Sequence, residues 1–143
     1  MNLVVDANLV FSCIVRSDGN IGEILLRSSD RFAFFAPDVL VQELERHHTK
    51  LRKMARMSDV ELRSVLAAIL RNITIIREPL LSKANLRKAE KLLTNVDLFD
   101  VPYLALALDL DCPLWTGDLK LIHGLRMRRF DQVVSTADLA KLK

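Results

Sequence analysis

Residues 95–121 read NVDLFDVPYLALALDLDCPLWTGDLKL and decide the fold of this chain. Within them, positions 103–108 are apolar almost throughout, which predicts a helix covered by other structure on nearly every side. Positions 114–116 then predict a short buried strand that ends just before Asp118. In an open parallel α/β sheet, the ligand crevice lies outside the carboxyl ends of the strands. Asp118 is therefore a candidate site residue.

The amino terminus has the same arrangement. Residues 2–5 predict a central strand buried on both faces, and Asp6 follows it directly. If this strand runs parallel to the one before Asp118, both aspartates lie at one edge of the sheet. The turn that carries Asp97 and Asp100 can reach the same place, so several acids are expected to converge there.

A further acid lies in a helix that we expect to begin at Pro37 and to run on into the basic segment 46–56. Apolar residues recur at helical spacing from Leu40 onward, and Glu43 lies within their stripe. A carboxylate among core positions is costly unless it is paired or binds a metal. Glu43 therefore joins the candidate site.

Composition is typical of a sheet buried under helices. The chain has 143 residues, 50% of them hydrophobic. Strands and helices alternate, which predicts one α/β domain over residues 1–143, a three-layer α/β/α sandwich with a mostly parallel sheet of about five strands. No apolar run approaches the ~20 residues of a membrane span, and no signal peptide is evident, so we expect a cytoplasmic protein without a membrane partner. Cys13 and Cys112 lack the neighbours of a zinc site.

The net charge of +3 is mild, but its distribution is uneven. Basic residues gather at 46–56 and at 126–129. Basic flanks around an acidic pocket suit a polyanion held near bound cations, although a solvated helix face explains either cluster alone equally well. The residues expected to contact such a polyanion are Arg46, Lys50, Arg52 and Lys53.

The ordered acids Asp6, Glu43, Asp100 and Asp118 resemble those of the PIN-domain ribonucleases, a family that includes the VapC-type toxins of toxin–antitoxin pairs. The resemblance covers essentially the whole chain, and its most specific parts are VVDANLV, VQELERH, DLFDVPYLALAL and LWTGDLKL. It implies a compact α/β/α sandwich that hydrolyses RNA phosphodiester bonds with Mg²⁺ or Mn²⁺ held by the four acids. The positions expected to support these acids are Asn8, Asp97 and Thr116.

The same resemblance implies partners. It indicates the toxin component of a toxin–antitoxin pair, with RNA as substrate, an antitoxin protein as partner and a homodimer as the assembly. The apolar side of one of the early helices is the candidate dimer interface. Ala7 and Gly117 depart from the residues most frequent in the family, but neither departure removes a carboxylate.

The chemistry of the acids agrees with a hard divalent cation. Mg²⁺ and Mn²⁺ prefer oxygen ligands and usually keep several waters, so a few carboxylates suffice. Such ions activate a water for attack on a phosphate, and no protein nucleophile is needed. Our hypothesis is that Asp6 and Asp118 are direct ligands, whereas Glu43 and Asp100 bind through water or orient the attacking water.

Each acid also has a structural interpretation. Asp97 and Asp100 are placed to cap the following helix, and Asp118 is placed to cap the next one. Glu43 could pair with a basic side chain. Asp6 has the weakest structural explanation, because no local backbone needs it.

Two other enzyme classes fit less well. A haloacid-dehalogenase-type phosphatase needs a second acid at position 8, which is Asn8, and a phosphoacceptor receiver domain needs an acid pair and a late lysine that are not evident. The stronger alternative is a catalytically silent or regulated PIN-type module that binds RNA or protein.

Overall fold

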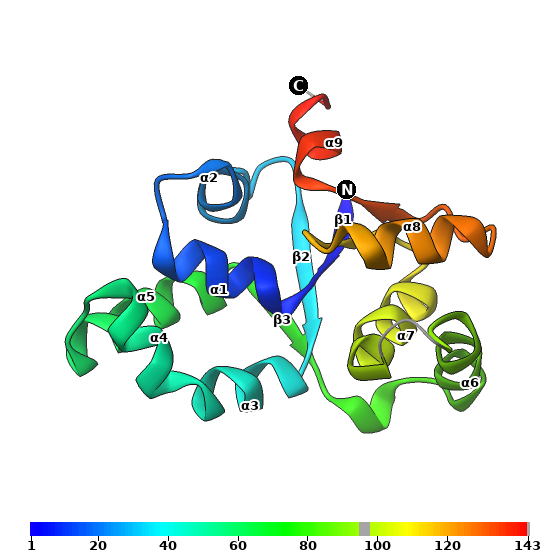
Figure 1. Ribbon diagram of the computed structural model, residues 1–143, viewed down its shortest axis with the longest axis horizontal. Coiled ribbons are helices and arrows are strands. Elements are labelled where there is room, and N and C mark those ends of the chain that lie inside the picture. Colours follow the sequence, from blue (N-terminus) through cyan, green and yellow to red (C-terminus); the bar gives the residue numbers. More distant parts are fainter. Residues whose placement is uncertain (95–97, 143) are drawn as a thin grey trace.

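The computed structural model describes residues 1–94 and 98–142. Its sheet has five strands in the order β3-β2-β1-β4-β5, and every neighbouring pair is parallel (Figure 1). The predicted parallel sheet is therefore confirmed. The strands are β1 (Asn2–Val5), β2 (Ala33–Pro37), β3 (Ile73–Ile76), β4 (Leu114–Trp115) and β5 (Val133–Val134).

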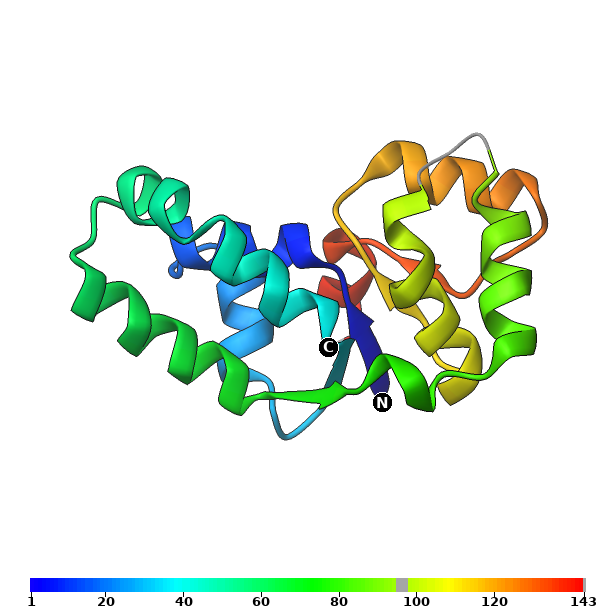
Figure 2. The same ribbon diagram turned by 90° about the horizontal axis from the view of Figure 1, so that it is seen from below.

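Helices cover both faces of this sheet. Helices α1 to α5 lie on one side of the strands and α6 to α8 on the other, which gives the three layers expected (Figure 2). The helices are α1 (Ala7–Val15), α2 (Asn20–Arg27), α3 (Val39–Arg46), α4 (His48–Ala55), α5 (Asp59–Arg71), α6 (Lys83–Leu92), α7 (Val101–Leu110), α8 (Leu119–Met127) and α9 (Thr136–Ala140), with 3₁₀ turns η1 (Glu78–Leu80) and η2 (Leu98–Asp100). In the described part of the chain, none of them is long and apolar enough to cross a membrane.

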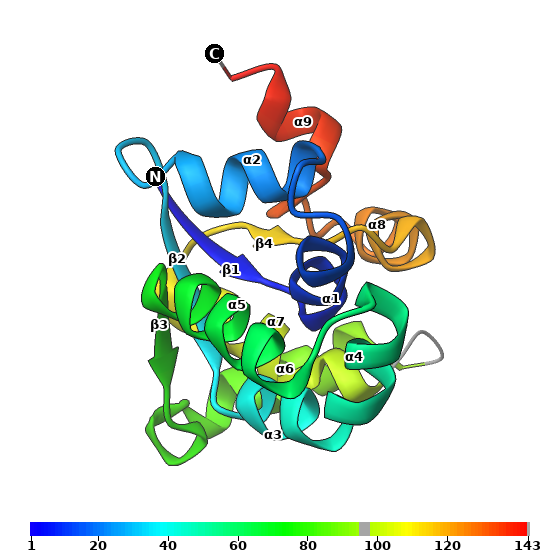
Figure 3. The same ribbon diagram turned by 90° about the vertical axis from the view of Figure 1, so that its left-hand side faces the viewer.

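The strand order creates a switch point between β1 and β4. From β1 the chain builds β2 and β3 on one side, and then crosses to build β4 and β5 on the other. Figure 3 shows β1 and β4 side by side and pointing the same way, and their register pairs Val5 with Trp115. Ligand crevices of doubly wound sheets lie at such switch points, so the residues that follow these two strands have the position of a site.

Helix α7 forms the core of one layer. It packs against β1, β2 and β4 on one side and against α6 on the other. The residues from Tyr103 to Ala107 are all buried, as the apolar segment predicted. The core continues through the sheet, where the rings of Phe34 and Trp115 lie 5.8 Å apart. Burial on every side fixes α7, and with it the side chains that α7 presents at the sheet edge.

The helix expected to begin at Pro37 is different in the structure. Pro37 is the last residue of β2 and pairs with Ile76 of β3, so the helix begins only at Val39. It also ends at Arg46, because His47 adopts φ −100° and ψ 12°. The prediction of one continuous helix was wrong. Most of the basic segment 46–56 lies on the separate helix α4, which packs against α1.

Candidate active site

Asp6 lies at the switch point, immediately after β1. Its backbone N–H donates to the carbonyl of Trp115 at 3.1 Å, which ties it to β4. Its side chain is only 4% exposed and accepts a hydrogen bond from Thr116 Oγ1 at 2.6 Å. Thr116 is itself fully buried and follows β4. The carboxylate of Asp6 is therefore held at the carboxyl ends of the two strands.

Asp118 lies next to this pair. Its backbone N–H donates to Thr116 Oγ1 at 3.1 Å, so one hydroxyl connects the two aspartates. Its Oδ1 accepts from the N–H groups of Lys120 at 3.0 Å and Leu121 at 3.2 Å, which caps α8. The capping role considered from the sequence is thus real. Both capping bonds end on Oδ1, and no described residue donates to Oδ2.

The surroundings of Asp6 disfavour its charge. Burial is the largest cause of a raised Asp6 pKa, and the charge of Asp118 adds to it. The Thr116 hydroxyl and the N–H groups of Asn8 and Ala7 act in the opposite direction without cancelling the rise. Among the described residues, no Lys, Arg or His forms an ion pair with Asp6. A buried carboxylate without a protein cation is the kind of group that a metal ion stabilises.

Glu43 reaches the same region from α3. It is half-buried, and burial raises its pKa, followed by the charge of Asp6. The Tyr103 hydroxyl donates to Glu43 Oε1 at 3.4 Å and, with the more distant charge of Arg46, lowers that pKa. Within the described chain, Glu43 has no ion pair, so the basic partner considered from the sequence is absent there.

Tyr103 is the buried residue on which the charges of three of the acids act. Its ring is 1% exposed on α7, and burial raises its pKa, as do the charges of Glu43, Asp6 and Asp100. Asp100 ends η2 and precedes α7, but its side chain makes no capping hydrogen bond to that helix. From the sequence, Tyr103 was expected only as a core residue. The sequence did contain one indication of a polar role, because Tyr103 is a phenol within an aliphatic segment and buried tyrosine hydroxyls usually have hydrogen-bond partners.

The charges of Asp6, Glu43 and Asp118 thus act on one another, with Asp6 in the middle, and the charge of Asp100 acts on Tyr103 beside them. Even so, in residues 1–94 and 98–142 no three His, Cys, Asp or Glu side chains are close enough to hold a metal ion as they stand. The set contains only oxygen donors, around a buried carboxylate that has no ion pair with a described residue. This chemistry fits a hard divalent cation that keeps several of its waters. Asp97 lies outside the described residues.

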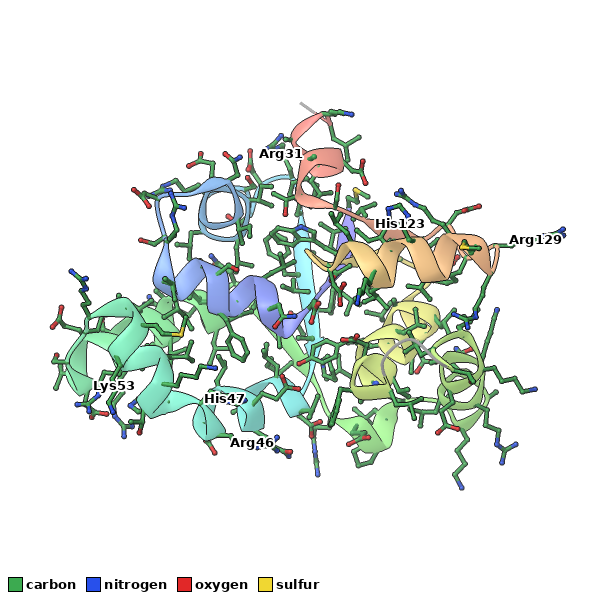
Figure 4. All side chains as sticks on the ribbon, in the orientation of Figure 1. Arg31, Arg46, His47, Lys53, His123 and Arg129 are labelled. Atoms are coloured by element: carbon green, nitrogen blue, oxygen red, sulfur yellow. The ribbon has the colours of Figure 1, made fainter. Side chains whose placement is uncertain are left out.

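The predicted RNA-binding residues lie along one side of the molecule. Arg46 is at the end of α3, and Lys50, Arg52 and Lys53 are on α4. Figure 4 shows Arg46 and Lys53 on this side, whereas Arg129 projects from the opposite end. Asn8, the expected supporting residue, is exposed on the first turn of α1.

The second basic cluster, residues 126–129, contacts other parts of the protein. These residues include the last two positions of α8 and the two positions after it, at the far end of that helix from Asp118. Arg126 lies 3.5 Å from Asp138, and Arg128 donates to the carbonyl of Thr94 at 2.6 Å. Two of its three arginines therefore have partners within the protein.

Comparison with known proteins agrees with the fold described above. The family model for the PIN domain matches residues 4–138. A structure of VapBC2 from Rickettsia felis bound to a DNA fragment from their promoter is similar with a TM-score of 0.69 and 14% identity, over 94% of this chain and 97% of the other. PAE2754 from Pyrobaculum aerophilum is similar with a TM-score of 0.64 and 16% identity, over 97% and 86%. At such identities the two structures show the fold alone. No curated protein sequence matches.

Tyr103→Phe is expected to lower the rate of a reaction that uses the Glu43 carboxylate roughly tenfold, as is common when a partner that orients an active-site carboxylate is removed. Phenylalanine keeps the buried ring and removes only the bond to Glu43. A thermal melt should show a loss of about 1 kcal/mol or less, the net contribution of one hydrogen bond. A wild-type reaction rate in this variant would show that the phenol does not orient Glu43.

Proposed function

The chain belongs to the PIN-domain family, and from that premise we propose that it is a divalent-metal-dependent ribonuclease that hydrolyses RNA phosphodiester bonds. The observation that carries the proposal is the carboxylate of Asp6. It is buried at the switch point, has no ion pair with a described residue, and is connected to Asp118 through the hydroxyl of Thr116. A buried carboxylate without a counter-ion does not stabilise the fold, whereas a bound cation would neutralise its charge.

Mg²⁺ or Mn²⁺ is the proposed cofactor. Asp6 and Asp118 would hold it directly, and Asp100 would contribute directly or through water. Oδ1 of Asp118 already accepts two backbone N–H groups, which leaves Oδ2 for the cation. When bound, the ion supplies an activated water and neutralises charge at the phosphate.

The remaining groups orient the reaction. Glu43 has a raised pKa, which makes its carboxylate a better acceptor for the proton of an attacking water. Tyr103 holds Oε1 of Glu43, and Thr116 holds Oδ2 of Asp6. The catalytic set that we propose is Asp6, Glu43, Asp100 and Asp118.

The proposal is tested by incubating a labelled single-stranded RNA with the purified protein. Cleavage is expected with Mg²⁺ or Mn²⁺ and is expected to stop in chelator. Absence of cleavage under every metal condition would favour the alternative, a silent or regulated module that binds RNA or protein.

The family suggests the wider role. We propose that the chain is the toxin of a toxin–antitoxin pair, that it acts in the cytoplasm, and that it forms a homodimer. A neighbouring gene for a small DNA-binding antitoxin would support the first part, and its absence would weaken it. Sedimentation that gives a monomer at micromolar concentration would contradict the dimer.

Replacing Lys50, Arg52 and Lys53 together with alanine is expected to weaken RNA binding and to flatten its salt dependence. For every phosphate that is no longer contacted, the slope of log affinity against log salt should fall by roughly 0.7 on a single strand. Fluorescence anisotropy with a labelled RNA at several salt concentrations measures this slope. An unchanged slope would mean that the three charges only solvate α4.

A further inference from the structure

A groove of about 940 Å³ opens between α1, α2 and α4. Its apolar lining comes from all three helices. Phe11 and Val15 belong to α1, Ile21 to α2, and Leu51 and Met54 to α4. Met54 is 56% exposed, so part of this apolar lining is accessible from solvent. The lining can therefore accept an apolar surface, such as the face of a nucleobase.

The rim of the groove carries positive charge. Arg16 and Lys50 line it, both are exposed, and within the described chain neither forms an ion pair. His47 lines it as well, and the described lining includes no Asp or Glu. An apolar floor with an unpaired cationic rim is complementary to a ligand that has both flat apolar groups and negative charges.

The groove lining includes none of the four candidate acids, but it includes residues close to two of them in the chain. Asn8 lines it and lies two residues after Asp6. His47 lies one helical turn after Glu43, and its backbone N–H donates to the Glu43 carbonyl at 3.0 Å. The side of the molecule that carries His47 and Lys53 is visible in Figure 4. These two neighbours support a path for a bound strand from the acids toward the groove.

Two rings lie within this lining. Phe11 and His47 contact each other edge to face, with ring centroids 5.8 Å apart, and both are half-buried. Bases of single-stranded nucleic acid stack on such side chains, and removal of one stack typically weakens binding by roughly 5- to 150-fold. Unpaired bases are also the usual target of RNA recognition.

We propose that this groove binds an unpaired nucleotide of the RNA strand that flanks the scissile phosphate. The base lies against Phe11 and His47, and Arg16 and Lys50 contact the backbone phosphates. The inference rests on the proposed ribonuclease function and deepens it, because it assigns a substrate subsite outside the acids.

Helix α4 provides a comparison within one element. Lys50 and Lys53 are both exposed, and among the described residues neither has an ion pair. Only Lys50 lines the groove. General attraction of RNA falls similarly when either charge is removed, so the difference between the two variants reports on the groove. Lys88, exposed on α6 in the opposite layer, serves as a distant control.

The experiment measures binding of a fluorescein-labelled single-stranded oligoribonucleotide by anisotropy. Every protein carries Asp118→Asn and is kept in chelator, so that the probe stays intact. Lys50→Ala should weaken binding several-fold more than Lys53→Ala and flatten the salt dependence by roughly 0.7. Lys88→Ala should bind as the parent does. Equal effects of Lys50→Ala and Lys53→Ala would overturn the groove as an RNA subsite.

The base contact is tested separately with Phe11→Leu, which keeps a half-buried apolar side chain and removes the ring. It should weaken binding of the ordinary oligonucleotide by roughly fivefold or more, and it should have little effect on an otherwise identical abasic oligonucleotide. An equal decrease on both probes would overturn the base contact. A circular dichroism melt verifies that each variant is folded.

Cleavage by the wild-type protein in Mn²⁺ separates the two claims. If it cleaves RNA while every groove variant binds the probe equally, the groove inference fails and the proposed function stands. If it binds the probe through the groove but never cleaves, the proposed function fails. If it neither binds nor cleaves RNA, both fail.

Discussion

Asp6→Asn is expected to reduce metal-dependent RNA cleavage by about a thousandfold or more. Loss of a direct ligand removes several kcal/mol of transition-state stabilisation, and each 1.36 kcal/mol corresponds to roughly a tenfold change in rate. Asparagine keeps the size of the side chain and an oxygen that can accept from Thr116 Oγ1. Single-turnover cleavage of a labelled RNA measures the decrease. Activity near that of the wild type would exclude Asp6 as a metal ligand.

The same substitution should stabilise the metal-free protein. Because the folded-state pKa of Asp6 is raised, the native state binds a proton more tightly than the unfolded state in the range between the two pKa values. The ionised carboxylate therefore destabilises the fold at neutral pH, and this cost is relieved as the pH falls through the folded pKa. Asp6→Asn has no carboxylate to titrate at this position, so it should not gain stability from Asp6 protonation as the pH falls. In chelator at neutral pH it should melt roughly 3 °C or more above wild type.

Asp109→Asn is the matched control, with the opposite sign. Burial acts to raise the pKa of Asp109, but hydrogen bonds from Asn85 and Ser82 outweigh it and leave the pKa lowered. Its ionised form therefore stabilises the fold at neutral pH, and that contribution disappears as the pH falls through its folded pKa. Melts of both variants in chelator across the acidic range should diverge from wild type in opposite directions. Parallel shifts would show that the Asp6 environment does not oppose its charge.

Asp118→Asn and Asp118→Ala are expected to abolish cleavage equally but to differ in stability. Asparagine caps a helix about as well as aspartate, so it can keep the bonds from Lys120 and Leu121, whereas alanine removes a cap that typically contributes about 1 kcal/mol. In the Asp118→Asn variant, loss of the negative charge at the helix N-terminus lowers the stability of the fold, whereas loss of the repulsion between positions 118 and 6 raises it. The net change should be small.

Thermal melts with chelator and with excess Mn²⁺ measure both roles of Asp118. The wild type should melt higher in Mn²⁺, because an ion that binds only the native state stabilises it by mass action. Neither variant should show this shift to the same extent. If Asp118→Asn cleaves RNA normally and keeps the metal-dependent shift, Asp118 is only a helix cap.

Much of the fold could be predicted because its signals are local. Two apolar strands that each precede an aspartate, and an apolar helix between the later acids, were enough to place Asp6 and Asp118 at one sheet edge. Pro37 was misassigned because proline suits both the end of a strand and the start of a helix, and only its pairing with Ile76 decides between them. The break at His47 has no comparable local signal.

The finer geometry of the site depends on contacts that the sequence does not display. Nothing local shows that Oδ1 of Asp118 turns toward α8, or that the Tyr103 hydroxyl meets Glu43 across 60 positions of sequence. The groove also depends on long-range packing, since Phe11 and Met54 line one groove only because α4 packs on α1. The basic segment was visible in the sequence, but the sequence did not show that Lys50 lines the groove and Lys53 does not.

The central claim is that carboxylates at the switch point hold a divalent ion for hydrolysis of RNA by water. The most direct test is end-group analysis of the RNA products formed by wild-type protein and by Asp6→Asn, in chelator and after Mn²⁺ is restored. Wild type with Mn²⁺ should yield 5′-phosphate and 3′-hydroxyl ends, because water rather than the neighbouring 2′-hydroxyl attacks, and the other three samples should yield no products. Cleavage that persists in chelator, or products with 2′,3′-cyclic phosphate ends, would contradict the account.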